Sequence, residues 1–132
     1  MKKLIFAILG LITCITISAQ SASFKSELIL SNGQSTELIE PVRISHEKNS
    51  SKYTLSFTFR GTLTVIDVNY KQYLKNSYCY TDGTKDDFVI VQSYSKLSDL
   101  INKELSPYAN ETRLIRIYTS RMEIALYLNE KL

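Results

Sequence analysis

The chain has 132 residues and a formal net charge of +3, from 16 Lys and Arg against 13 Asp and Glu. Two of the basic residues, Lys2 and Lys3, lie in an N-terminal leader, so the rest of the chain is nearly neutral. Binding to nucleic acid requires clustered positive charge, which argues against that class of partner. Only four glycines are present, so a glycine-rich phosphate-binding loop is not expected either.

The first nineteen residues predict a secretory signal peptide. Two lysines precede an apolar run over 4–17, and the small residue Ala19 follows. This order of basic, apolar and small regions is typical of such leaders. The run is shorter than the ~20 apolar residues of a membrane-spanning helix, and we predict no such helix in the mature chain. The ending ISAQ resembles bacterial export signals, which implies a periplasmic or extracellular protein that begins at Gln20.

A second interpretation of the leader uses Cys14. The stretch LITC at 11–14 is faintly similar to a bacterial lipoprotein box, in which the cysteine carries the lipid anchor. Thr13 stands where such boxes prefer Gly or Ala. We therefore favour a signal peptide over 1–19, followed by a single exported domain over 20–132.

Alternation of apolar and polar residues predicts β-strands in the first half of the domain. One strand is expected over 24–30, and the Asn32-Gly33 pair after it is the strongest short signal for a hairpin. The returning strand, 37–45, contains Pro41, which has no N–H to donate. That strand should therefore lie at an edge or be broken by a bulge. The clearest alternation, KYTLSFTFR at 52–60, predicts one buried and one wet face.

The pattern becomes less regular after Gly61. β-branched residues over 62–68 predict a further strand, whereas NYKQYLKN at 69–76 is consistent with a short helical turn. The continuous apolar centre of the segment 86–94 predicts a central strand buried on both faces.

One segment has helical spacing. Its apolar residues share one face over 97–105, and Ser95 stands where a helix cap is expected. Two strands joined by a turn near Ser120 follow. Strands on both sides of a single helix predict an α+β fold, with a mostly antiparallel sheet of about seven or eight strands and the amphipathic helix packed on one face. A small β-barrel or a sandwich of the same strands is the alternative.

The stretch 67–87 combines four tyrosines, a cysteine and four aspartates. Tyrosine offers apolar area together with a hydroxyl and is favoured in interfaces, so we predict a binding surface formed by Tyr70, Tyr73, Tyr78 and Tyr80. Packing of these rings at the rim of the core is the competing interpretation. Asp82-Gly83 predicts a turn. The aspartates at 82, 86 and 87 lack the spacing of a calcium loop, so neither a metal site nor a cofactor is predicted.

Catalytic residues are not predicted. His46 is the only histidine, and Cys79 is the only cysteine after the leader. Such residues can form a nucleophile pair, but no flanking signature and no G-x-S-x-G turn accompanies them. We interpret Cys79 as a buried thiol, with a dimer linked through Cys79 as the alternative.

These exclusions favour a small, exported, non-catalytic domain of the bacterial envelope. We expect it to bind an envelope protein through the tyrosines or through an exposed sheet edge. The alternative is a carrier that holds a small apolar ligand between the sheet and the helix. A small hydrolase using His46 or Cys79 is the least favoured function.

Overall fold

The computed structural model describes residues 19–83, 89–120 and 123–132. The predicted signal peptide and Cys14 lie outside these ranges, apart from Ala19. The described residues contain one α-helix, one 3₁₀ turn (Asn110–Arg113) and nine strands. The helix is α2 (Leu97–Asn102), and the strands are β1 (Ala19–Leu30), β2 (Ser35–Glu37), β3 (Val42–Glu47), β4 (Lys52–Phe59), β5 (Thr62–Leu74), β6 (Ser77–Thr81), β7 (Ile90–Ser93), β8 (Leu114–Tyr118) and β9 (Glu123–Lys131).

The strands form one antiparallel sheet whose pairings close into a ring. Neighbours follow chain order from β3 to β9, and β9 pairs in turn with β1. On the edge opposite β9, β1 is long enough to pair with two strands, with β3 over Ala19–Phe24 and with β2 over Glu27–Ile29. The predicted antiparallel sheet is thus confirmed, with nine strands among the described residues instead of seven or eight.

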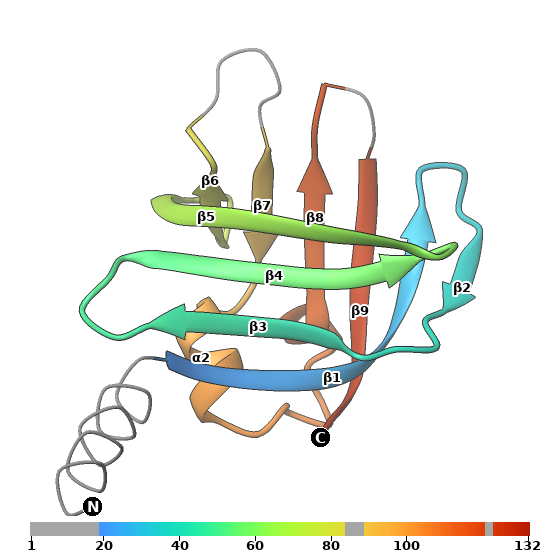
Figure 1. Ribbon diagram of the computed structural model, residues 1–132, viewed down its shortest axis with the longest axis horizontal. Helices are drawn as coiled ribbons and strands as arrows, with labels where there is room; N and C mark the ends of the chain where they lie inside the picture. The colour runs from blue at the N-terminus through green and yellow to red at the C-terminus, as the bar shows by residue number, and fades with distance from the viewer. Residues whose placement is uncertain (1–18, 84–88, 121–122) are drawn as a thin grey trace, which may run out of the picture.

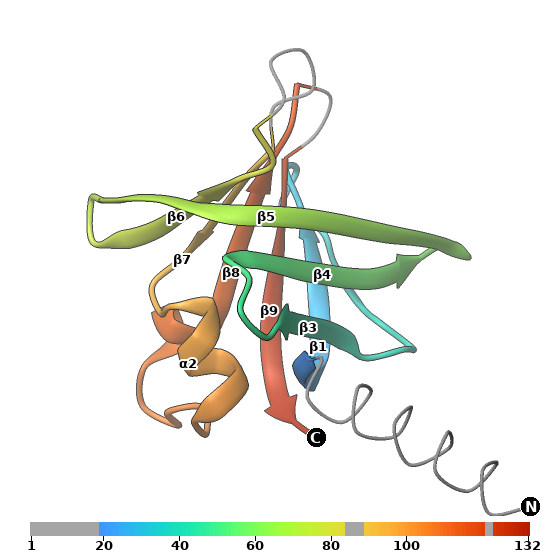
Figure 2. The same ribbon diagram turned by 60° about the vertical axis from the view of Figure 1, so that its left-hand side comes forward.

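Figure 1 shows that the ring has two layers. β3, β4 and β5 run across the front, β6 to β9 run crosswise behind them, and β1 bends from the front layer to the back. Figure 2 shows α2 below β7, near the end where β5 turns into β6. The helix contacts β1 and β3.

The core fills the space between the layers, and alternation along the strands explains its composition. Inward-facing residues of β1 and β4, such as Phe24, Leu28 and Leu55, are fully buried, as are Leu126 and Leu128 of β9. Burying a side chain of this size contributes about 1.5–3 kcal/mol. The predicted alternation over 24–30 and 52–60 is confirmed.

Two predictions in the first half need correction in detail. The strand expected over 37–45 is split into β2 and β3, and Pro41 lies directly before β3, in agreement with the predicted break. The helical turn expected over 69–76 is wrong, because β5 continues to Leu74. Pairing with β6 decides the conformation there, since strand propensity depends on the partner strand more than on local spacing.

The strand predicted over 86–94 is shorter and less buried than expected. β7 covers Ile90–Ser93, and only Val91 and Ser93 are buried, because one face of the ring points outward. Residues 86–88 lie outside the described ranges.

The helix is also shorter than predicted. α2 ends at Asn102, with Leu97, Leu100 and Ile101 buried, while Leu105 lies beyond its end and is half-buried. The predicted cap at Ser95 is wrong, since Lys96 precedes the first helical residue without a capping side-chain bond. Nowhere in the described ranges is there a helix with the length and apolarity needed to cross a bilayer.

Candidate functional site

Strands β5 and β6 bring the four predicted tyrosines together in two cross-strand pairs. Tyr70 lies opposite Tyr80 and Tyr73 opposite Tyr78, with ring centroids 5.7 Å and 4.9 Å apart. A bulge between Tyr70 and Gln72 makes this possible, because it absorbs the extra residue that separates the tyrosines on β5. Aromatic pairs of this kind contribute about 0.5–1.5 kcal/mol each beyond their buried area. We call these four residues the tyrosine cluster.

The members of the tyrosine cluster differ in exposure. Tyr70 is 52% and Tyr73 54% exposed, and Leu74, on the opposite face of β5, is also exposed. Tyr78 is half-buried and Tyr80 is only 3% exposed. The surface that a partner could touch therefore consists mainly of Tyr70 and Tyr73, while Tyr80 belongs to the core beneath them.

Tyr80 joins the tyrosine cluster to the helix. Its hydroxyl oxygen accepts a hydrogen bond from the N–H of Leu97, the first residue of α2, at 3.0 Å. Burial raises the pKa of Tyr80 to about 12, although the bond from Leu97 acts in the opposite direction. The hydroxyl therefore stays protonated at neutral pH and serves as a structural contact, not as a general base.

The row of rings continues onto two further strands. Tyr53 of β4 meets Tyr80 edge-on at 6.0 Å, and His46 of β3 stacks on Tyr53 at 4.4 Å. His46 Nε2 also donates to the carbonyl oxygen of Ser50. The sequence did not point to Tyr53 and His46 as neighbours of the tyrosines, because only the pairing of β3, β4, β5 and β6 brings them together.

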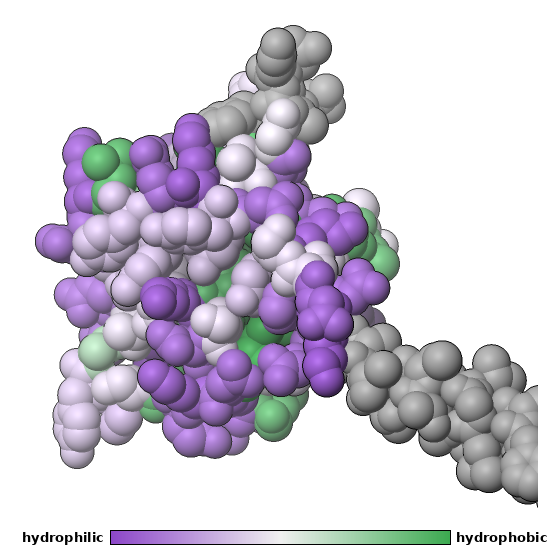
Figure 3. Space-filling model, turned by 90° about the vertical axis from the view of Figure 1, so that its left-hand side faces the viewer, coloured by the Kyte–Doolittle hydropathy of each residue, from purple (hydrophilic) through white to green (hydrophobic). Residues whose placement is uncertain are grey.

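Figure 3 faces this end of the molecule. Residues of intermediate hydropathy, drawn pale, lie among hydrophilic ones in purple, and hydrophobic atoms in green are visible between them. Lys96 adds a cation near the tyrosine cluster, with its Nζ 5.7 Å from the centroid of the Tyr78 ring. The surface thus combines aromatic faces, hydroxyls and a positive charge.

Cys79 and His46 have different partners. The buried thiol of Cys79 donates to the carbonyl oxygen of Ser77 at 3.8 Å and accepts from Nε2 of Gln92 at 3.7 Å. His46 is engaged with Ser50 and Tyr53. In the sheet order, β4 and β5 lie between the strands that carry the two residues.

Acidic, histidine and cysteine side chains are the candidate metal ligands of the chain. In the part of the chain that the structure describes, no three of them gather closely enough to hold an ion. Asp86 and Asp87 fall in the range 84–88, outside that part.

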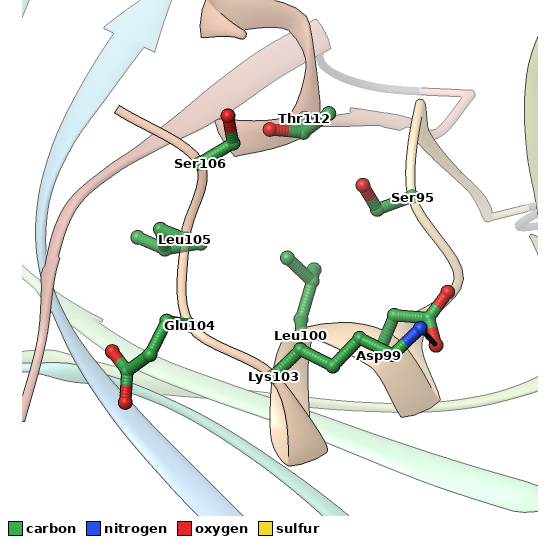
Figure 4. A pocket seen from close by; sticks show the side chains of 8 residues that line it. All are labelled: Ser95, Asp99, Leu100, Lys103, Glu104, Leu105, Ser106 and Thr112. Atoms are coloured by element: carbon green, nitrogen blue, oxygen red, sulfur yellow. Dashed lines mark ion pairs between the residues drawn. The ribbon is translucent and has the colours of Figure 1, made fainter. Parts of the chain in front are cut away.

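A small pocket of about 160 Å³ lies beside α2 (Figure 4). It is about the size of five water molecules in the liquid. Asp99 and Lys103 form an ion pair of 3.5 Å at its edge. Two of the hydroxyls at its rim are engaged locally, since Thr112 donates to the Ala109 carbonyl and Ser106 accepts from the Tyr108 N–H. The pocket is suited to a few waters.

Two larger cavities lie at the other end of the front layer, near the turn between β4 and β5. The outer one, of about 420 Å³, is lined by the segment 36–40 and by residues 58–61. The inner one, of about 300 Å³, lies between the layers and is lined mainly by apolar side chains of β1, β4 and β9. Phe59 and Arg60 line both. The sequence did not reveal these cavities, because residues from distant strands form their walls.

Comparison of the chain with protein-family models, with curated proteins and with solved structures finds no match.

Proposed function

We propose that the protein is a small, exported, non-catalytic binding domain of the bacterial envelope, and that it contacts an envelope protein through Tyr70 and Tyr73. The observation that carries the proposal is the exposure of two aromatic rings on the same face of β5, with the buried Tyr80 behind Tyr70. Exposed apolar and aromatic groups gathered in one place are typical of interaction surfaces.

Rigid support of the two exposed rings strengthens this proposal. Tyr70 and Tyr73 project from the part of β5 that pairs with β6, and each packs against a tyrosine ring of β6, whereas the pairing of β5 with β4 ends at Asn69. A ring held by its neighbour loses little conformational entropy on binding, which favours affinity.

The first experiment compares capture of partners by the purified protein and by a Tyr70→Ala, Tyr73→Ala variant, from detergent-solubilised envelope of the source bacterium. Removing two central aromatic side chains should reduce capture of a true partner at least about tenfold. Tyr108→Ala is the matched control, because Tyr108 is 95% exposed and lies outside the tyrosine cluster. A partner kept by the control and lost by the double variant supports the proposal. Equal capture by all three proteins contradicts it.

The paired cavities favour a second candidate function, the carrier of a small apolar ligand. The inner cavity reaches between the two layers, where Leu28 and Ile124 are buried, and Phe59 and Arg60 line both cavities. Ligand sites in proteins have this character, with an apolar lining and few polar groups.

A further inference from the structure

The inner cavity has an apolar interior and one charged residue at its mouth. Five of its lining residues are apolar: Leu28, Leu30, Phe57, Phe59 and Ile124. Arg60 is the only charged residue among the lining residues, and the hydroxyl-bearing Thr62 and Thr64 complete the wall. A ligand that fits this arrangement is apolar over most of its length and negatively charged at one end.

The arrangement of β5 explains why the cavity opens to solvent. β6 pairs with β5 only from Asn69 onward, so among the described residues the preceding part of β5, 62–68, has a strand partner on the β4 side alone. Thr62 and Thr64 belong to this part and line the cavity. The cavity thus lies beside a part of β5 that no second strand covers among the described residues.

Arg60 is held at the mouth without an anionic partner. Its guanidinium lies over the Phe59 ring, 4.9 Å from the centroid. Within the described ranges it forms no hydrogen bond or ion pair. Glu40, which lines the outer cavity, is engaged instead with the Thr58 hydroxyl at 3.2 Å. Arginine presents paired donors that match the geometry of a carboxylate.

We propose that this cavity binds a single-chain anionic amphiphile, with its acyl tail among the apolar residues of the inner cavity and its carboxylate on Arg60. The volume of about 300 Å³ corresponds to about ten water-sized groups, which suits a medium-length chain. The proposal rests on the second candidate function and specifies its ligand class. It is independent of the tyrosine cluster at the other end of the front layer.

The turn between β4 and β5 allows a clean test of the charge. Arg60 and Gly61 have φ of 52° and 77°, the left-handed values of a two-residue hairpin turn in which Asn is favoured. Arg60→Asn therefore removes the guanidinium without disturbing the turn. Lys75 has the same φ of 52° in the equivalent turn between β5 and β6, so Lys75→Asn is a control with the same charge change at a distant site.

The experiment measures binding of decanoate, decanol and decyltrimethylammonium to the purified protein by calorimetry. We expect decanoate to bind at least tenfold more tightly than decanol, because a charge-assisted hydrogen bond to Arg60 is worth about that factor or more. Decyltrimethylammonium should bind most weakly. Arg60→Asn should remove the preference for decanoate over decanol, and Lys75→Asn should keep it.

A third variant tests the location of the tail. Thr64→Phe places a large ring in the inner cavity at a strand position that tolerates aromatic residues, so it should weaken both decanoate and decanol at least tenfold. Thermal melting checks that this variant folds, and the comparison of Arg60→Asn with Lys75→Asn stands without it.

The outcomes separate the ligand class from the carrier function. Three results would overturn the proposal that the ligand is anionic and leave the carrier function standing. They are equal affinity for decanoate and decanol, tighter binding of decyltrimethylammonium than of decanoate, and an unchanged preference for decanoate in Arg60→Asn. Absence of binding by all three probes would overturn both. None of these binding results bears on the capture of a protein partner through Tyr70 and Tyr73.

Discussion

Tyr80 and Leu97 join the sheet to its helix through a hydrogen bond of 3.0 Å, in which the Leu97 N–H donates to the Tyr80 hydroxyl. The first N–H groups of a helix have no partner within the helix and need one from elsewhere. In α2 this partner comes from strand β6, seventeen residues earlier in the chain, and no capping side chain of the preceding residue takes part.

Tyr80→Phe should therefore lower the free energy of unfolding by about 1–2 kcal/mol, because it leaves a buried N–H without an acceptor. Urea unfolding followed by circular dichroism measures the change. Tyr73→Phe is the control, since its ring is half exposed, and it should alter stability by less than about 0.5 kcal/mol. Equal effects of the two substitutions would contradict the structural role of the Tyr80 hydroxyl.

Tyr80 should also make the fold sensitive to alkali. Burial raises its pKa to about 12, above the value of about 10 for an unfolded tyrosine. The folded state thus holds the Tyr80 proton more tightly than the unfolded state does. The stabilisation that comes from the protonated Tyr80 is therefore fully present below pH 10 and is lost as the pH rises towards 12. Its size is about 2–3 kcal/mol. Unfolding free energies measured from pH 9 to 12 should fall more steeply for the native protein than for Tyr80→Phe.

The opposite end of α2 depends on a lysine of the last strand. Lys131 Nζ donates to the carbonyl oxygens of Ile101 and Lys103 at 2.7 Å and 2.9 Å. These carbonyls lie at the C-terminal end of the helix, where a positive charge is favourable. Lys131→Met should destabilise the protein by about 2 kcal/mol in thermal or urea unfolding.

Lys25→Met is the matched control for the Lys131 substitution. Lys25 is well exposed, and its ion pair with Glu130 spans 3.8 Å. Pairs of this kind contribute less than about 1 kcal/mol, so the control should be nearly as stable as the native protein. If Lys131→Met and Lys25→Met lower the free energy of unfolding equally, the contacts of Lys131 with the end of α2 do not stabilise the protein.

Cys79 should react slowly with thiol reagents in the folded protein. Its side chain is buried and its sulfur contacts Ser77 and Gln92. Labelling in the native state should be at least about a hundredfold slower than in denaturant, because it requires local opening of the sheet. Rapid native labelling, or a disulfide-linked dimer on a non-reducing gel of the folded protein, would instead favour the intermolecular role.

The regular strands could be predicted because their signal lies within each segment. Alternation over 52–60 and in β9 depends only on which residues face the core, and it predicts β4 and the buried residues Ile124, Leu126 and Leu128. The segment 69–74 was different. Its apolar spacing suits a strand or a helical turn, and the pairing with β6 decides between them.

The candidate sites were only partly predictable. The sequence singled out the tyrosines, yet it could not distinguish the exposed Tyr70 from the buried Tyr80, because that difference depends on tertiary contacts such as the one between Tyr80 and the start of α2. The cavity at Arg60 was not predicted at all. Its walls come from β1, β4, β5 and β9, and residues so far apart in the sequence share no local pattern.

The pairing of β1 with β9 has a consequence for how the chain is made. Leu28 lies opposite Leu126, so β1, which is synthesised early, cannot pair with β9 until β9 has also left the ribosome. Until then its apolar face is available to a chaperone, and contacts of such wide sequence separation form slowly. The proposed export suits this order of folding, because a chain whose ring is still open can pass through a translocation channel unfolded.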